Sequence, residues 1–84
     1  MKKETILILD DQPEILNSLQ IMLKDKYKVH LASSGKQALE ILKQNEIAVI
    51  LADQRMPEMT GVEFLSRSIE IQPDSVRMLI TAYA

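Results

Sequence analysis

The chain has no cysteine, a single histidine and no long apolar run, and these absences remove several classes of function. Without cysteine it forms no disulfide and no thiolate metal site, and the composition suits a reducing compartment, so we expect a cytoplasmic protein. The first apolar run is short and ends in two acids. We therefore expect neither a signal peptide nor a membrane span.

An excess of basic charge is also missing. Ten Lys and Arg stand against twelve Asp and Glu, for a net charge of −2, and the basic residues are scattered along the chain. Because no basic stripe forms, we expect no direct binding to nucleic acid or to a membrane. With 46% hydrophobic residues and no repeat or linker, the sequence predicts one small domain over residues 1–84.

Two continuous apolar runs end in acids. Residues 5–9 and 47–52 are rich in β-branched types and too short for typical helices, which predicts buried strands of a parallel sheet. The first run is followed by Asp10 and Asp11, and the second by Asp53. Ligand sites of open parallel sheets lie outside the carboxyl ends of the strands, where these acids could meet. Taken alone, Asp53 is equally well explained as a turn residue whose side chain accepts from backbone amides.

The other segments alternate helical and strand patterns. The start of each predicted helix fits a capping box. These boxes pair Asp11 with Glu14, Ser34 with Gln37 and Thr60 with Glu63. Helices are predicted over residues 14–26, 35–45 and 62–71, and further strands over residues 27–32 and 76–80. The single histidine, His30, is expected on the solvent side of a half-buried edge strand rather than at a metal.

Helical periodicity also predicts which side chains form the core. In the first helix we expect an inward stripe, with Ile21 off the stripe and exposed. In the second helix we expect four inward residues, and the third helix shows a broad apolar face. The predicted core residues are Ile15, Leu19, Met22 and Leu23, with Leu16 at the edge, then Ala38, Leu39, Ile41 and Leu42, and finally Val62, Phe64, Leu65 and Ile69.

Strands that alternate with helices predict βαβ units with right-handed crossovers, hence a doubly wound α/β sheet. In the strand order 2-1-3-4, the first and third strands are neighbours, and the connections that leave them turn in opposite directions. Ligand sites lie at such switch points, so Asp10, Asp11 and Asp53 would line one crevice.

Three carboxylates at one edge repel each other unless they share a cation or a proton. Oxygen ligands with open water positions suit Mg²⁺, which would allow a carboxylate to attack a phosphoryl group. Asp53 is the best nucleophile candidate because it stands alone at the end of the most buried strand. Thr81 follows the last strand at the same edge, where its hydroxyl could reach a phosphoryl oxygen.

Three features together resemble the receiver domain of two-component response regulators, over essentially all 84 residues. They are the Asp10-Asp11 pair, the spacing Asp53-x-x-Met56-Pro57-x-x-x-Gly61, and Thr81-Ala82 further along the chain. The resemblance implies a flavodoxin-like, CheY-like fold, here βαβαβαβ with strand order 2-1-3-4.

By that resemblance Asp53 accepts a phosphoryl group from a phosphohistidine on a histidine sensor kinase or a phosphotransfer protein. Mg²⁺ would be held by Asp11 directly, by Asp10 through water, by Asp53 and by the backbone carbonyl of Arg55. Thr81 would be the switch hydroxyl. The protein would not be a classical enzyme; at most it would catalyse its own phosphorylation and dephosphorylation.

The chain departs from the family by stopping just past the fourth strand, so we expect a truncated receiver. The lysine that ends the family's fifth strand would be missing, and phosphorylation should be slower as a result. Arg55 could supply a substitute cation, or it is simply an exposed arginine. Strands three and four would be bare on one face, so we expect self-association through that face or through the fourth strand.

Two functions from different classes follow. The first is a Mg²⁺-dependent phosphoacceptor, and the second is a receiver-derived interaction or dimerisation fragment without productive phosphorylation. A nucleotide-binding enzyme on a similar sheet fits poorly, because the loop after the first strand lacks the glycines that let a backbone approach a pyrophosphate.

Overall fold

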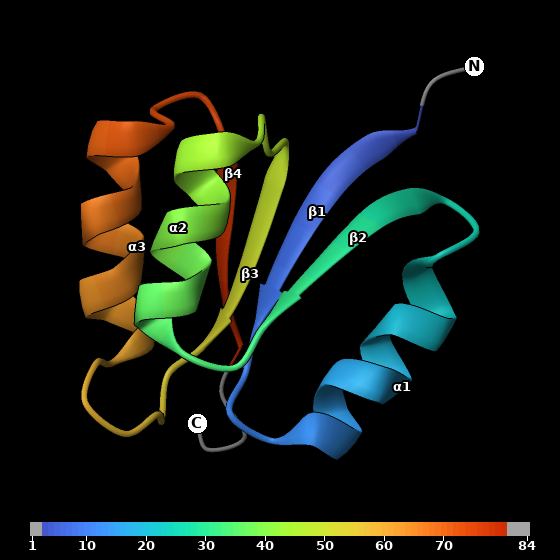
Figure 1. The fold of residues 1–84 in the computed structure, drawn as a ribbon, viewed down its shortest axis with the longest axis horizontal. Coiled ribbons are helices and arrows are strands. Elements are labelled where there is room, and N and C mark those ends of the chain that lie inside the picture. Colours follow the sequence, from blue (N-terminus) through green and yellow to red (C-terminus); the bar gives the residue numbers. More distant parts are fainter. Residues whose placement is uncertain (1–2, 81–84) are drawn as a thin grey trace.

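The structure is a computed structural model that describes residues 3–80. Within that range no helix is long and apolar enough to cross a membrane. Strands and helices alternate along the chain as predicted (Figure 1). The elements are β1 (Glu4–Leu9), α1 (Pro13–Leu23), β2 (Tyr27–Ala32), α2 (Gly35–Gln44), β3 (Val49–Asp53), α3 (Gly61–Ile71) and β4 (Val76–Ile80).

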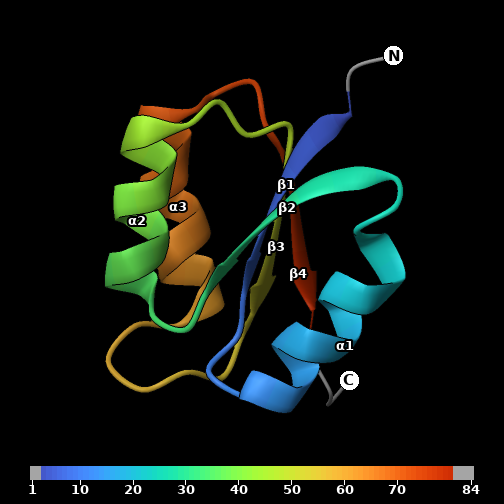
Figure 2. The same cartoon turned by 45° about the vertical axis from the view of Figure 1, so that its right-hand side comes forward.

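The four strands form one parallel sheet in the order β2-β1-β3-β4, which confirms the predicted topology. Helices α2 and α3 lie together on one face of the sheet and α1 lies on the other (Figure 2). The connection after β1 leads to α1 on one face of the sheet, and the connection after β3 leads to α3 on the opposite face (Figure 2). The β1–β3 boundary is therefore a topological switch point.

The two faces of the sheet carry cores of different size. The larger cluster lies beneath α2 and α3 and is centred on Phe64, which is fully buried. The smaller one lies beneath α1 and has only Ile6, Ile8 and Leu16 as buried members. The other buried members of the larger cluster are Leu7, Leu9, Ala32, Ala38, Leu42, Ile47, Ile50 and Ala52.

Two features predicted for α1 are wrong. Ile15 and Met22 are not core residues, because 39% and 71% of their surface is exposed, whereas Leu16 is buried. The helix faces the sheet with Leu16, Leu19 and Leu23, so the stripe is rotated from the predicted one. Ile21 is exposed, as predicted.

The expected capping box between Asp11 and Glu14 is also absent. The N-cap is Gln12, which makes no side-chain cap, and Pro13 occupies the first helical turn. Proline is suited to this position because it lacks the N–H that would have no helical partner. The helix ends at Leu23, three residues before the predicted end.

In α3 the capping box of Thr60 and Glu63 is confirmed, but the predicted broad apolar face is wrong. Val62 and Ile69 are exposed by 51% and 53%, while Phe64 and Ser68 are buried. Because α3 packs beside α2 and against β3 and β4, only the narrow side of the helix that carries Phe64 and Ser68 is covered. In α2, Ser34 Oγ accepts from Gln37 N as predicted, and the four predicted inward residues are buried or half-buried.

Candidate metal centre

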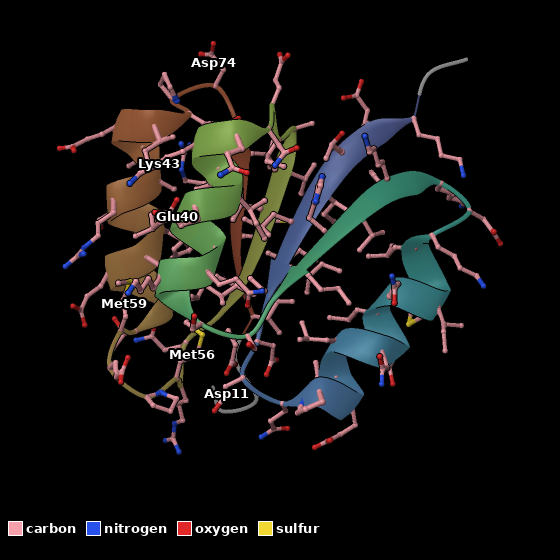
Figure 3. All side chains as sticks on the ribbon, in the orientation of Figure 1. Asp11, Glu40, Lys43, Met56, Met59 and Asp74 are labelled. Carbon is pink, nitrogen blue, oxygen red and sulfur yellow. The ribbon has the colours of Figure 1, made fainter. Side chains whose placement is uncertain are left out.

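Three carboxylates converge at the carboxyl ends of the strands. Asp10 and Asp11 follow β1, and Asp53 ends β3; the pairing of Leu9 with Ala52 brings these chain ends side by side. One carboxylate oxygen from each aspartate lies within 4.8 Å of the other two. Figure 3 shows Asp11 at this edge, below the ends of the strands. The predicted convergence of the three acids is therefore present.

Asp10 is the most buried of the three, with 8% of its surface exposed. Burial raises the pKa of the Asp10 carboxyl, and the negative charges of Asp53 and Asp11 raise it further. The hydrogen bond from Gln12 N to Asp10 Oδ1, at 2.9 Å, partly offsets these effects and lowers the pKa. A charged Asp10 thus costs free energy here unless a cation is shared.

The donor set fits a hard divalent cation. It consists of carboxylate oxygens only, and Asp11 and Asp53 are partly exposed, so solvent can supply further ligands. Mg²⁺ prefers oxygen ligands and keeps several waters when it binds through a few carboxylates. A cation among these side chains would also remove the mutual repulsion that raises the pKa of Asp10.

Gln54, directly after Asp53, fixes the acid-bearing end of β3. Its N–H donates to the carbonyl of Ile80 at 3.2 Å, and its carbonyl accepts from Gly61 N at 3.1 Å. Its side-chain Oε1 accepts from Val62 N at 3.0 Å, in the first turn of α3. The sequence analysis missed this role, because nothing in the local pattern shows that β4 and α3 meet at Gln54.

Gly61 is required by close packing at the same junction. A Cβ added there would collide with the backbone oxygen of Asp53 and would lie 2.6 Å from Leu79 Cδ1. The start of α3 therefore lies directly against the backbone of Asp53. Any larger residue would displace either the helix or the acid.

The loop between β3 and α3 is strained. Glu58 has a positive φ of 69°, and Met59 N donates to Pro57 O at 2.7 Å, which closes a three-residue γ-turn. A Cβ at Gly35 would lie 2.6 Å from the sulfur of Met59, so the loop also rests on the start of α2. Figure 3 shows Met56 and Met59 on this side of the molecule, and both pack against the larger core.

The remaining predicted residues lie elsewhere. Arg55 is exposed in the same loop and makes an interaction of its own. His30 is half-buried on β2 and does not belong to the acidic group. Thr81, the predicted switch hydroxyl, lies outside the described residues. The ion pair of Lys43 with Glu40, at 3.6 Å on the exposed side of α2, is remote from the acids (Figure 3).

Comparison with known proteins identifies the family. The profile described as response regulator receiver domain matches residues 6–84. The hydrogenase transcriptional regulatory protein HoxA of Cupriavidus necator is 39% identical over 82 residues, which cover 98% of this chain and 17% of the relative. A probable cyclic di-GMP phosphodiesterase of Vibrio cholerae is 44% identical over 63 residues, which cover 75% of this chain and 14% of the relative.

Solved structures agree with the profile. A CheY-like receiver domain protein from Methanospirillum hungatei matches with a TM-score of 0.94 and 28% identity, over 99% of this chain and 67% of that one. A receiver domain protein from Clostridium thermocellum matches with a TM-score of 0.87 and 31% identity, over 93% of this chain and 64% of that one. The chain belongs to the response regulator receiver domain family.

Members of this family act in two-component signalling as regulatory phosphoacceptors that pair with histidine kinases or phosphotransfer proteins, and they are not classical enzymes. The chain spans about a sixth of the length of the curated relatives HoxA from two organisms, at 17% and 16%. The regulatory and catalytic activities in the relatives' names are therefore properties of those longer proteins.

Proposed function

We propose that this chain is a Mg²⁺-dependent phosphoacceptor, modified on Asp53 by a histidine sensor kinase or a phosphotransfer protein in the cytoplasm. The observation that carries the proposal is the convergence of three carboxylates within 4.8 Å at the switch point of the sheet. Family membership supports the class of partner, and the cysteine-free sequence suits the compartment.

Asp53 is assigned as the nucleophile. In the transfer, a carboxylate oxygen of Asp53 forms a bond to phosphorus while the phosphorus–nitrogen bond of the phosphohistidine breaks, and the leaving imidazole takes up a proton. Gln54 and Gly61 hold Asp53 in place through the backbone of β3 and the start of α3. Positioning is the main contribution that a protein makes to phosphoryl transfer, together with charge stabilisation.

The other acids supply the charge environment. Asp10, Asp11, Asp53 and the backbone carbonyl of Arg55 would hold Mg²⁺, which would offset the negative charge between the nucleophile and the incoming phosphoryl group. We assign the switch hydroxyl, which would bind the phosphoryl oxygen after transfer, to Thr81. This assignment is carried by the family motif at residues 81–82.

The proposal is tested by intact mass after incubation with acetyl phosphate, in Mg²⁺ and separately in EDTA. We expect a gain of one phosphoryl group in Mg²⁺ only, and no gain for Asp53→Asn. Circular dichroism of each sample controls for folding. A folded protein that gains no mass in Mg²⁺ would contradict phosphoacceptance by this chain.

A second candidate, a self-associating interaction fragment, is favoured by the exposed apolar side chains of β4. Val76, Met78, Leu79 and Ile80 are exposed by 57%, 52%, 40% and 40%. Apolar side chains gathered on one edge strand mark an interaction surface more often than scattered ones do. Sedimentation velocity tests this candidate, which predicts a concentration-dependent dimer; a monomer at every concentration would contradict it.

A further inference from the structure

Two of the four N–H groups that open α3 are bound by the residue that follows Asp53. The first four N–H groups of a helix have no partner inside it, and in α3 they belong to residues 60–63. The backbone carbonyl of Gln54 accepts from Gly61 N at 3.1 Å, and its side-chain Oε1 accepts from Val62 N at 3.0 Å. The first turn of α3 is therefore anchored to the end of β3.

The other two N–H groups are bound inside the capping box. Glu63 N donates to Thr60 Oγ1 at 3.1 Å, and Thr60 N donates to Glu63 Oε1 at 3.3 Å. Both acceptors belong to the helix or to its N-cap, so they stabilise the first turn without joining it to the sheet. Gln54 and Thr60 thus each give one side-chain acceptor to the same turn, but only Gln54 connects it to the strand of Asp53.

The peptide group between Asp53 and Gln54 is fixed on two sides. Its carbonyl oxygen lies so close to Gly61 that an added Cβ would collide with it. Its N–H, which belongs to Gln54, donates to Ile80 O at 3.2 Å. A shift of the first turn of α3 would therefore be passed directly to the backbone of the acid.

We propose that the side chain of Gln54 is a positioning residue for the reaction of Asp53. By holding Val62 N, it keeps the first turn of α3 packed against the peptide group of Asp53. The carboxylate then keeps the orientation in which it binds the cation and attacks phosphorus. The inference rests on the proposed function, because it concerns the reactivity of Asp53, and it requires no contact between Gln54 and the phosphoryl donor.

The hydrogen bond to Val62 N can be removed without loss of the fold. Val62 is exposed by 51%, so water can bind its N–H when the Gln54 acceptor is absent. The backbone bonds of Gln54 and the capping box would remain. The first turn would lose one of its two bonds to Gln54, so its contact with Asp53 should loosen while the helix persists.

Gln54→Met tests the inference, because methionine has nearly the same length and lacks the amide oxygen. Thr60→Val is the matched control, since it also removes a side-chain acceptor from the first turn and keeps the branched shape. Circular dichroism and urea denaturation should show that both variants fold and are less stable than the parent protein. Only Gln54→Met should also react slowly.

The rate of phosphorylation is measured by intact mass over a series of acetyl phosphate concentrations in Mg²⁺. Gln54→Met should lower the maximum rate by about tenfold, since a misplacement of about 1 Å can cost about a hundredfold. The donor concentration at half-maximal rate should not change, because the Gln54 side chain is bonded to α3. Thr60→Val should stay within about twofold of the parent rate, because the capping box is not joined to β3.

Gln54→Glu is the rescue variant. A carboxylate oxygen of glutamate can accept from Val62 N, and a negative charge is favourable at the N-terminus of a helix. In high salt, which screens the added charge from the acids, this variant should recover to within about threefold of the parent rate. A role of Gln54 in apolar packing alone would predict the reverse, with the methionine variant faster than the glutamate variant.

Three outcomes would overturn the inference. They are equal slowing of Gln54→Met and Thr60→Val, a Gln54→Met variant that reacts at the parent rate, and a Gln54→Glu variant that is as slow as Gln54→Met. If the parent protein gains no phosphoryl group, the proposed function fails and Mg²⁺ titration scores the inference instead. Gln54→Met should bind Mg²⁺ about threefold or more weakly than Thr60→Val, because Asp53 is a ligand. Equal affinities would overturn it.

Discussion

The two faces of the sheet differ in how well they are covered. Beneath α2 and α3 the central strands β1 and β3 contribute buried side chains, and only Leu79 of the apolar strand residues is exposed there, by 40%. On the α1 face β3 and β4 carry half-buried or exposed residues. By strand alternation Asp53 belongs to the α1 face, in register with the exposed Ile80. The well-packed face therefore supports the fold, and the candidate site lies at the edge of the more open face.

The largest expected effect is the loss of core packing on the covered face. Phe64→Ala removes a fully buried ring from the larger cluster, which should cost about 3–5 kcal/mol of unfolding free energy. For a domain of this size that is most of the stability. Urea denaturation measures it, with Met22→Ala as the exposed control, for which we expect a change within about 0.5 kcal/mol. Equal effects would contradict the contrast between the faces.

The next largest effect should separate Gly61 from Gly35, two glycines that both lie in close contact with other residues. Gly61→Ala would force a Cβ against the backbone of Asp53 and should cost about 1–3 kcal/mol while displacing the acid. Gly35→Ala meets the flexible side chain of Met59 instead, so it should cost less. Denaturation gives both free energies, and Mg²⁺ titration should show weaker binding for Gly61→Ala. Equal losses of unfolding free energy for the two variants would show that the backbone at Asp53 and the start of α3 can move apart at little cost.

A smaller effect should appear at Asp10. Since burial and neighbouring charges raise its pKa in the folded state, the folded protein binds more protons than the unfolded chain at pH values just above the usual range of aspartate. This carboxyl therefore lowers stability as the pH rises through that window, and the loss persists at neutral pH.

Asp10→Asn keeps the oxygen that accepts from Gln12 N but removes the charge. In EDTA at pH 7 the variant should be more stable than the parent, with a smaller advantage at acid pH, as measured by thermal denaturation. Added Mg²⁺ should stabilise the parent more than the variant, because the variant has lost a carboxylate ligand, so the stability advantage of the variant should shrink or reverse. A variant that is less stable in EDTA at neutral pH would contradict the assigned repulsion.

The smallest expected effect is at the strained loop. Glu58→Gly allows the positive φ of 69° without a Cβ, and we expect stabilisation by about 0.5–1 kcal/mol. Glu63→Gln, in the adjacent capping box, is the control, because it removes a nearby negative charge and leaves the backbone conformation of the loop unchanged. A destabilised Glu58→Gly would show that the Glu58 side chain makes a contact that outweighs the strain.

The sheet order and the acidic cluster could be predicted because both follow from local patterns. Apolar runs that end in acids and alternate with helices permit few topologies, and neighbouring parallel strands end at the same edge. The position of α1 on the sheet could not be predicted this way. Periodicity shows that the helix has an apolar side, but Ile15 and Met22 are as apolar as Leu16, and only tertiary packing decides which of them is covered.

The roles of Gln54 and Arg77 were also beyond local patterns. Gln54 bonds to residues that are seven to 26 positions further along the chain, in α3 and at the end of β4. Arg77 interrupts an apolar strand, and its partners at the end of α3 appear only once the crossover has formed. Both residues join elements whose meeting depends on the complete fold.

The most direct test of the central claim is phosphorylation by phosphoramidate, whose phosphorus–nitrogen bond resembles that of phosphohistidine. The protein is incubated with this donor in Mg²⁺ or EDTA, and the modified residue is located by peptide mass mapping. The account predicts one phosphoryl group, on Asp53, formed only in Mg²⁺. Modification of another residue, or equal modification in EDTA, would contradict the claim that this acidic cluster is a metal-dependent phosphoacceptor site.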